Sequence, residues 1–216
     1  MKQSRPAPPP TPPVNQAKPG GGLDASSFLQ ACSAETDSVL ALIPVENPVL
    51  TTSGHPSFLF YVPDSPEAIE KVEFSILSSD EKTRMYHTQF QLKAIPGVVQ
   101  IDVPPLPEHE LEEDQDYHWY FKLYCQGNQS SRADLNVNGW VQRVAMTPER
   151  SHQIANASPT IWYDSVAQVA TALYESPQDP TLQTQWYDLL ESIGYEALAS
   201  VPLLGPIEVE DHESNG

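Results

Sequence analysis

The sequence predicts an immunoglobulin-like antiparallel β-sandwich of about seven strands over residues 31–146, followed by a C-terminal helical hairpin over residues 147–204. Three observations lead to this fold class. Short apolar segments recur about every ten residues between turn-forming residues, as is typical of a sandwich. In the middle of the chain, large apolar side chains alternate with polar ones. After Met146 the apolar residues recur at helical spacing, which indicates a change of secondary structure.

Residues 1–30 are predicted to be a disordered tether rich in proline and glycine. The first 22 residues contain seven prolines, three consecutive glycines and almost no large apolar side chain. Such a segment cannot bury enough apolar surface to offset the conformational entropy that ordering would remove. We therefore interpret it as a polyproline-like tether to the rest of the chain.

Seven segments are predicted as strands because they are short, rich in β-branched and aromatic residues, and bounded by proline, glycine or polar turns. They cover residues 38–45, 57–62, 71–77, 85–92, 98–103, 117–125 and 133–146. A polar turn joins the third and fourth segments, which predicts a hairpin. In the last segment the alternation slips near Asn138 and Gly139, so we expect a β-bulge there.

The segment 117–125 is predicted to be a central strand. Its buried face is predicted to consist of Tyr117, Trp119, Phe121, Leu123 and Cys125, which occupy every second position. The opposite face is predicted to carry His118, Tyr120, Lys122 and Tyr124. Leu111 precedes Tyr117 at the spacing of a leucine and a tyrosine that close the loop before a late strand of an immunoglobulin-like sandwich.

Helices are predicted where a capping residue precedes a proline. Thr147 begins a short helix that extends to about Ala155, and two longer amphipathic helices follow at 161–173 and 180–193. Gly194 is placed to cap the last of these. Because each longer helix has a single apolar stripe, we expect the pair to pack on the sandwich or on a partner. The acidic residues 205–216 are predicted to be a flexible tail.

The net charge of −18 restricts the partners that the protein can bind. The 11 lysines and arginines are widely spread, so no basic patch is expected to bind nucleic acid or an anionic membrane. No apolar run reaches the length of a membrane-spanning helix, so membrane insertion is not expected. The acidic run 108–116 is interpreted as a solvated loop rather than a cation site, since it lacks the spacing of a calcium loop.

The two cysteines, Cys32 and Cys125, allow one disulfide bond. Cys125 ends the buried face of the central strand and Cys32 precedes the first strand, so the two could meet at a sheet edge. A disulfide would indicate an oxidising compartment, whereas two buried thiols would fit a reducing cytoplasm. Lys2 and Arg5 are not followed by the apolar stretch of a secretory signal. An extracytoplasmic location would therefore require that a leader is missing from this chain.

Several motifs together resemble a known family. They are Thr51-Thr52-x-x-x-Pro56-x-Phe58-x-Phe60, Pro96-Gly97-Val98-Val99, Tyr117-x-Trp119-Tyr120-Phe121, Gly139-Trp140-Val141-Gln142-Arg143-Val144, Ile161-Trp162-Tyr163-Asp164 and Leu189-Leu190-Glu191-Ser192-Ile193-Gly194. Their order from about Cys32 to Leu204 resembles the family called domain of unknown function 928, found mainly in cyanobacteria. The resemblance implies an exported protein with no assigned activity and no recognised catalytic residues.

No motif that carries a reaction is found in the sequence. There is no Gly-x-Ser-x-Gly elbow, and neither cysteine has a histidine nearby in the sequence to act as its base. Beyond the tether the glycines stand alone, so no phosphate-binding loop is expected. The histidines His55, His87, His109, His118 and His152 lack a second ligand at metal-binding spacing. We therefore predict no catalytic residue, no metal site and no cofactor.

Aromatic residues supply the candidate binding residues. Tyrosines predicted to lie opposite the core are Tyr61, Tyr120, Tyr124, Tyr163 and Tyr187. Exposed aromatic surface often marks a contact site, but the helical pair could equally cover these side chains. Arg143 could anchor the acidic loop by a bidentate pair or present a cation to a ligand.

These observations favour a non-enzymatic, extracytoplasmic domain that binds a protein or glycan of the cell envelope. One alternative is a cytoplasmic adaptor whose helical hairpin binds a partner and whose thiols are free. The other is an enzyme of a type that no motif identifies.

Overall fold

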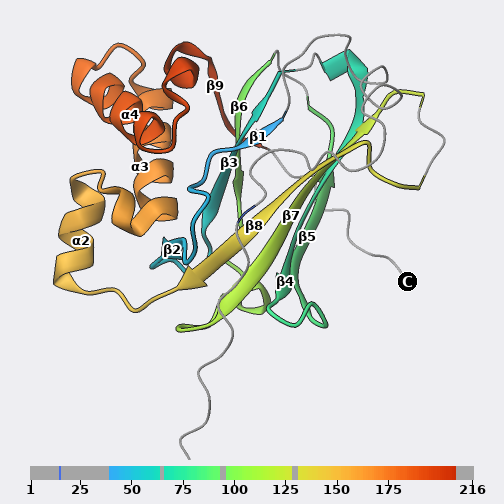
Figure 1. Cartoon of the computed structure of the whole chain (residues 1–216), viewed down its shortest axis with the longest axis horizontal. Helices are drawn as coiled ribbons and strands as arrows, with labels where there is room; N and C mark the ends of the chain where they lie inside the picture. The colour runs from blue at the N-terminus through green and yellow to red at the C-terminus, as the bar shows by residue number, and fades with distance from the viewer. Residues whose placement is uncertain (1–14, 16–38, 64–65, 93–95, 128–130, 208–216) are drawn as a thin grey trace, which may run out of the picture.

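The computed structural model describes residues 15, 39–63, 66–92, 96–127 and 131–207 (Figure 1). Apart from Asn15, the predicted tether lies outside the described residues. The strands are β1 (Leu40–Ala41), β2 (Leu50–Thr51), β3 (Ser57–Val62), β4 (Ile69–Ser78), β5 (Arg84–Phe90), β6 (Gly97–Asp102), β7 (Asp116–Cys125), β8 (Leu135–Arg143) and β9 (Leu203–Pro206). The described α-helices are α2 (Pro148–Ala155), α3 (Trp162–Glu175) and α4 (Pro180–Ser192). A β-rich chain with helices at its C-terminal end is thus confirmed.

The strands form two sheets. One has four strands in the order β1-β3-β6-β9, and the other has five in the order β2-β8-β7-β4-β5. Most neighbours are antiparallel, but β2 runs parallel to β8 and β9 runs parallel to β6. The prediction of a wholly antiparallel structure is therefore wrong, because both sheets are mixed. β2 is too short to produce an alternating pattern, and β9 is separated from the other strands by the helices, so the sequence signals neither.

The first predicted strand, 38–45, does not form one continuous element. Among the described residues Leu40 and Ala41 pair with β3 as a strand, and the Leu42 N–H also donates to the carbonyl of Leu59. The chain then crosses to the other sheet, where β2 pairs with the end of β8. A single N-terminal stretch therefore contributes to both sheets. The apolar residues around β1, such as Leu42 and Ile43, are buried although they lie outside a strand.

One hydrophobic core joins the two sheets and the helices. Phe60 of β3 stacks on Phe121 of β7, with ring centroids 4.0 Å apart, and Phe58 lies 4.9 Å from Phe74 of β4. Trp119, on the predicted buried face of the central strand, is fully buried and makes edge contacts with both Phe58 and Phe60. The two-residue alternation in β7 therefore places its large apolar side chains between the sheets, as predicted.

The predicted β-bulge at Asn138 and Gly139 is wrong. β7 and β8 pair in one continuous register over their described residues, with Trp119 opposite Gly139. The inward position opposite Trp119 requires a glycine, because a Cβ there would lie 2.5 Å from Cζ2 of Trp119. Trp140 then points outward. The apparent slip in the sequence comes from a glycine on the apolar face and a tryptophan on the polar face, not from an extra residue.

Leu111 and Tyr117 close the loop before β7. Leu111 is fully buried, and the backbone N–H of Glu112 donates a 2.9 Å hydrogen bond to the hydroxyl of Tyr117. A tyrosine at the start of a strand, bonded to backbone a few residues upstream, is the arrangement known as a tyrosine corner. It fixes the path by which the acidic run 108–116 enters the central strand.

The helices lie on the side of the four-stranded sheet (Figure 1). α3 packs against β3 and β9, and Thr171 is within 3.3 Å of the Gln100 amide on β6. The outward-facing Leu59 and Gln100 are consequently buried. Both faces of β3 are covered, which explains why its sequence is almost continuously apolar.

Buried hydrogen bonds attach the start of α3 to the sheets. The Asp164 carboxylate accepts hydrogen bonds from the Thr51 hydroxyl at 2.6 Å and from the Thr52 backbone N–H and hydroxyl. The Trp162 indole donates to the carbonyl of Leu42 at 2.8 Å. These contacts join α3 to β2 and to the chain near β1, so the helices pack on the sheets.

The chain returns to the four-stranded sheet after α4. Gly194 ends this helix with φ of +76°, a conformation that favours glycine. Leu203 then pairs with Val98, and the Ile207 N–H donates to the carbonyl of Gln100. The sequence predicts a loose tail from Gly205 onward, but residues 205 and 206 belong to β9. Residues 208–216 lie outside the described part of the chain.

Candidate interaction surface

The outer face of the five-stranded sheet differs from that of the other sheet. Its residues alternate with the core positions of β4, β5, β7 and β8, and Figure 1 shows the helices on the far side of the molecule. His87 and Gln89 of β5 are exposed, and Tyr120, Lys122 and Tyr124 of β7 are half-buried. Where the other sheet packs under α3, this face carries polar and aromatic side chains at the surface.

Four aromatic side chains belong to this face, two of them buried and two partly exposed, with Lys122 between the last two. They are Trp140 of β8 and His118, Tyr120 and Tyr124 of β7, and we call them the aromatic row. The rings of His118 and Trp140 are stacked, with centroids 4.4 Å apart and an interplanar angle of 5°. His118 and Tyr120 meet at 4.3 Å with a tilt of 45°.

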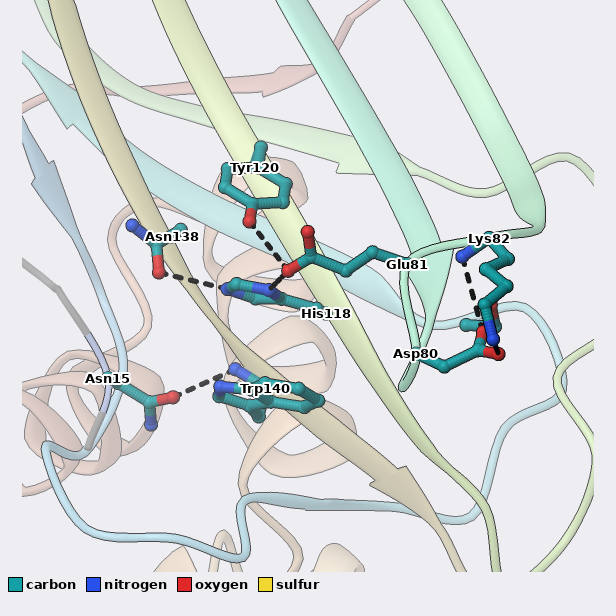
Figure 2. Close-up of polar contacts among 9 residues, drawn as sticks. Asn15, Asp80, Glu81, Lys82, His118, Tyr120, Asn138 and Trp140 are labelled. Atoms are coloured by element: carbon teal, nitrogen blue, oxygen red, sulfur yellow. Dashed lines mark hydrogen bonds and ion pairs between the residues drawn. The ribbon is translucent and has the colours of Figure 1, made fainter. Parts of the chain in front are cut away.

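His118 is the centre of a hydrogen-bonded cluster (Figure 2). Its Nδ1 lies 2.6 Å from Oε1 of Glu81, and its Nε2 lies 3.0 Å from Oδ1 of Asn138. The Tyr120 hydroxyl donates to the same Glu81 oxygen at 2.9 Å. Only 8% of the surface of His118 is exposed, so the neighbouring side chains hold the ring in a single orientation.

Glu81 reaches the cluster from the turn between β4 and β5. Its backbone has φ of +57°, a left-handed conformation that is uncommon for residues other than glycine, and its N–H donates to the carbonyl of Ser78. Asp80 and Lys82 flank it with an exposed ion pair of 2.9 Å. The turn therefore places one carboxylate over the aromatic row while its other charged residues face solvent (Figure 2).

A second carboxylate, Glu73 of β4, lies further along the row. It accepts from Lys122 Nζ at 3.1 Å and from the Tyr124 hydroxyl at 3.3 Å. The ammonium of Lys71 lies 4.4 Å from the centre of the Tyr124 ring, within the range of a cation–π contact. The surface thus combines aromatic rings with charges of both signs.

The environment shifts the pKa of several of these groups. Hydrogen bonds from His118 and Tyr120 lower the pKa of the Glu81 carboxyl. Burial acts to raise the pKa of Glu73, but the hydrogen bond and charge of Lys122 outweigh it and lower that pKa. Burial, with the bond to Glu81, raises the pKa of Tyr120 to about 12. At neutral pH both carboxylates are ionised and Tyr120 keeps its proton, so the row presents fixed donors and acceptors.

The sequence-predicted tyrosines lie in different surroundings. Tyr120 and Tyr124 belong to the aromatic row. Tyr61 of β3 is half-buried and packs against the core on the side of the other sheet. Tyr163 was predicted to lie opposite the core, and this is wrong: it is 1% exposed and lies between Phe58 and Trp119. Tyr187 of α4 is 42% exposed and distant in sequence from the row.

Arg143 lies against the acidic loop. Its Nη1 donates to Glu110 at 2.9 Å and to the carbonyl of Leu111. The Arg143 side chain is 18% exposed and its carbonyl accepts from the N–H of Asp114. The contacts join the end of β8 to the loop that precedes β7, and they are made to one carboxylate and one carbonyl rather than to both oxygens of a carboxylate.

The sequence did not single out Trp140 and His118 as site residues. His118 stands alone among the histidines, and Trp140 looks like a core residue displaced from its alternation. The signal that could have found them is their cross-strand pairing on the polar face, since His118 is directly opposite Trp140. Such a pair becomes visible only when the register of β7 and β8 is known.

Cys125 is buried at the end of β7. Cys32 lies outside the described residues, so the predicted disulfide between them remains a prediction. Within the described ranges, histidine, cysteine, aspartate and glutamate side chains nowhere gather in threes that could hold a metal ion. Over the same ranges, none of the helices has the length and apolar character needed to span a bilayer.

Two solved structures show a distant likeness to this chain. The fibronectin type III domain of human collagen alpha-1(XX) shares 16% identity, with 44% of this chain and 77% of that chain covered and a TM-score of 0.28. Astrotactin-2, described as a vertebrate-specific, perforin-like membrane protein, shares 11% identity, with 72% of this chain and 28% of that chain covered and a TM-score of 0.31. Scores this low carry no argument about fold or function.

Comparison with functionally curated proteins finds no match. A family model does match, and it spans residues 19–203, which include both sheets up to the start of β9 and all three described α-helices. The match includes the aromatic row, the turn that carries Glu81 and the loop held by Arg143. The chain therefore belongs to the family described as Domain of Unknown Function (DUF928).

Proposed function

We propose that this protein is a non-enzymatic, extracytoplasmic interaction domain that binds a protein or glycan of the cell envelope through the outer face of its five-stranded sheet. The observation that carries the proposal is the position of the aromatic row. The helices pack on the opposite sheet, while Tyr120 and Tyr124 remain partly exposed beside Glu73 and Glu81.

The composition of this surface supports the proposal. Aromatic side chains are enriched at contact sites because they bury much apolar area with little loss of rotamer entropy, and tyrosine hydroxyls add hydrogen bonds. The carboxylates of Glu73 and Glu81 hold the hydroxyls of Tyr124 and Tyr120 in fixed positions. A pre-ordered surface loses less entropy when a partner binds.

The same proposal includes an immunoglobulin-like sandwich as the framework of the domain. Its support is the strand order β1-β3-β6 facing β8-β7-β4-β5, the aromatic contacts between the sheets and the corner formed by Leu111 and Tyr117. The pair α3 and α4 would then be an addition to that framework, with β9 returning to the edge beside β6.

The function is tested by affinity isolation from the envelope fraction of the native organism. The full chain and the variant Tyr120→Ala/Tyr124→Ala are compared side by side, with retained proteins identified by mass spectrometry and retained polysaccharide by sugar analysis. Tyr187→Ala, which removes an exposed tyrosine from α4, is the matched control. We expect a partner that is retained by the wild type and the control and lost by the double variant. Equal retention by all three proteins would contradict the proposal.

The extracytoplasmic location has its own test. A disulfide between Cys32 and Cys125 would fit an oxidising compartment. Thiol titration of protein isolated from its native cells under denaturing conditions should find reactive thiols only after reduction. Two reactive thiols without reductant would favour a cytoplasmic adaptor instead.

A further inference from the structure

The outer face of the five-stranded sheet gathers positive charge in a strongly acidic chain. The chain has 29 aspartates and glutamates against 11 lysines and arginines. Lys71 of β4, Arg84 of β5 and Lys122 of β7 nevertheless all belong to this one face. Residues 151–207, which include α3, α4 and β9, contain no lysine or arginine, and the helices lie on the far side of the molecule (Figure 1). The charge is therefore distributed unequally between two sides of the fold.

Two of the three cations on this face have no carboxylate partner. Lys122 is paired with Glu73 at 3.1 Å, but neither Lys71 nor Arg84 forms an ion pair with any residue that the structure describes. The ammonium of Lys71 lies 4.4 Å from the centre of the Tyr124 ring, and Arg84 is exposed. In a chain with so many acids, two unpaired cations on one face leave positive charge available to an external anion.

His87 of β5 lies among these cations. Partial burial is the main cause that lowers its pKa. The charge of Glu73 acts to raise the pKa of His87, whereas the charges of Arg84, Lys122 and Lys71 act to lower it. Three cations and one carboxylate thus act on a single imidazole. The middle of the face therefore carries an excess of positive charge.

Each lysine on this face lies beside a partly exposed tyrosine. The ammonium of Lys122 is 5.6 Å from the centre of the Tyr120 ring, so it repeats the pairing of Lys71 with Tyr124. Both tyrosine hydroxyls donate to carboxylates, and their oxygen atoms can still accept from hydroxyl groups of a ligand. The two tyrosines are four residues apart on β7, which is about 13 Å at the rise of a strand. Two similar sites in a line suit a ligand that repeats its own chemistry.

The remainder of the face is hydrophilic, which favours a sugar over a protein surface. The large apolar side chains that the described residues expose are Val45, Leu106, Met146, Tyr174 and Tyr187, and none of them lies on this face. Its aliphatic members, Leu77 and Met85, are only partly exposed. The centre of a protein–protein interface is usually apolar. A carbohydrate is instead bound through its hydroxyl groups and through contacts of its C–H groups with aromatic rings.

We propose that the outer face of the five-stranded sheet binds a polysaccharide that carries carboxylate groups. Lys71 and Arg84 bind the carboxylates, and Tyr120 and Tyr124 contact the sugar rings. A neutral glycan would leave both cations without a partner. This inference rests on the proposed function, because it names the chemical class of the partner that the same face receives.

The test is fluorescence anisotropy of the full chain with a labelled oligogalacturonate as the probe. The site variants are Lys71→Gln and Arg84→Gln. Arg150→Gln is the matched control, because it removes the same charge from α2, where the guanidinium donates to the Ala145 carbonyl. We expect Kd to rise about two- to fivefold in each site variant, as for the loss of an exposed ion pair, and to stay unchanged in the control. Urea denaturation verifies that each variant is folded.

The imidazole of His87 gives a second readout, which reports where the probe binds. Its pKa is measured by NMR with and without the oligogalacturonate, and the spectrum of His87→Gln identifies its resonance. A carboxylate bound nearby favours the protonated ring, so the pKa of His87 should rise in the complex. A pKa that does not change on binding would overturn the inference, because the probe would then lie on another surface.

Other results would also overturn the inference. These are no binding of the probe, equal affinity for a labelled neutral maltose oligomer, or an equal rise of Kd in Arg84→Gln and Arg150→Gln. Tighter binding of polyglutamate of the same length would identify an acidic peptide as the partner instead.

Failure of this inference can be distinguished from failure of the proposed function. If the probe does not bind but envelope retention still depends on Tyr120 and Tyr124, only the acidic glycan is contradicted. If Tyr120→Ala/Tyr124→Ala retains both the probe and the envelope material like the wild type, the proposed function is contradicted as well.

Discussion

The indole N–H of Trp119 donates a 2.8 Å hydrogen bond to the hydroxyl of Tyr163, and both side chains are buried. The Tyr163 hydroxyl in turn donates to the carbonyl of Trp140 at 2.9 Å. One phenol thus connects the central strand β7, the neighbouring strand β8 and the first turn of α3. Burial raises the pKa of Tyr163, so the hydroxyl remains protonated as the donor that this arrangement requires.

Replacing Tyr163 by phenylalanine should destabilise the protein by about 1–3 kcal/mol, because the Trp119 N–H and the Trp140 carbonyl would both lose a buried partner. The free energy of unfolding is measured by urea denaturation. Tyr187→Phe is the matched control on an exposed tyrosine and should change stability by less than about 0.5 kcal/mol. Equal effects of the two substitutions would show that the buried bonds do not stabilise the fold.

Gly139→Ala should destabilise the protein by about 1–3 kcal/mol, since a side chain must be forced into a filled space. The new Cβ would lie 2.5 Å from Cζ2 of Trp119, and Trp119 is fully buried and cannot move aside freely. Chemical denaturation gives the stability, and tryptophan fluorescence reports any displacement of the indole. Gln142→Ala, on the outer face of the same strand, should stay within about 0.5 kcal/mol of the wild type. If Gly139→Ala left the free energy of unfolding unchanged, β7 and β8 would have to move apart at this position without any loss of stability.

Glu81→Gln should make the protein less stable at neutral pH and reduce its sensitivity to acid. The pKa of Glu81 is lowered in the folded state from its ordinary value of 4.5. A carboxyl of this kind contributes stability above its unfolded pKa and loses that contribution as the pH falls through its folded pKa. The effect is small because Glu81 is largely exposed and solvent screens its contacts.

The measurement is urea unfolding of the wild type and Glu81→Gln at a series of acidic pH values. The stability difference between the two proteins should be largest near neutral pH and should shrink as the pH falls below 4.5, the ordinary pKa of a glutamate. A difference that stays constant over the whole series would show that the ionised carboxylate is not what His118 and Tyr120 recognise.

Much of the fold follows from patterns that are local in the sequence. The alternation in β7 places Trp119 and Phe121 in the core, and the Leu111 to Tyr117 spacing anticipates the bond between Glu112 and Tyr117. α2 and α4 begin at the expected capping residues, since the Thr147 hydroxyl accepts from the Arg150 N–H and the Asp179 carboxylate accepts from the Leu182 N–H. In each case neighbours along the chain determine the geometry.

Predictions from the sequence are wrong where a residue distant in the chain determines the local structure. Gly139 looks like a bulge until Trp119 is placed opposite it, and Tyr163 looks like a surface tyrosine until Trp119 and Trp140 enclose it. β9 follows the helices and makes its pairing only with β6, so its four residues show no pattern of their own. Contacts of this kind join residues that are tens of positions apart.

By itself, therefore, the sequence determined the β-rich class, the change to helices after Met146 and the identity of the central strand. These properties depend on periodicity and capping, which short-range sterics impose on any chain. The tertiary structure alone decided that the helices cover the four-stranded sheet and leave Tyr120 and Tyr124 partly exposed on the other, beside the buried rings of His118 and Trp140. This arrangement depends on which apolar faces bury each other. Long-range packing of this kind cannot be predicted from any single stretch of residues.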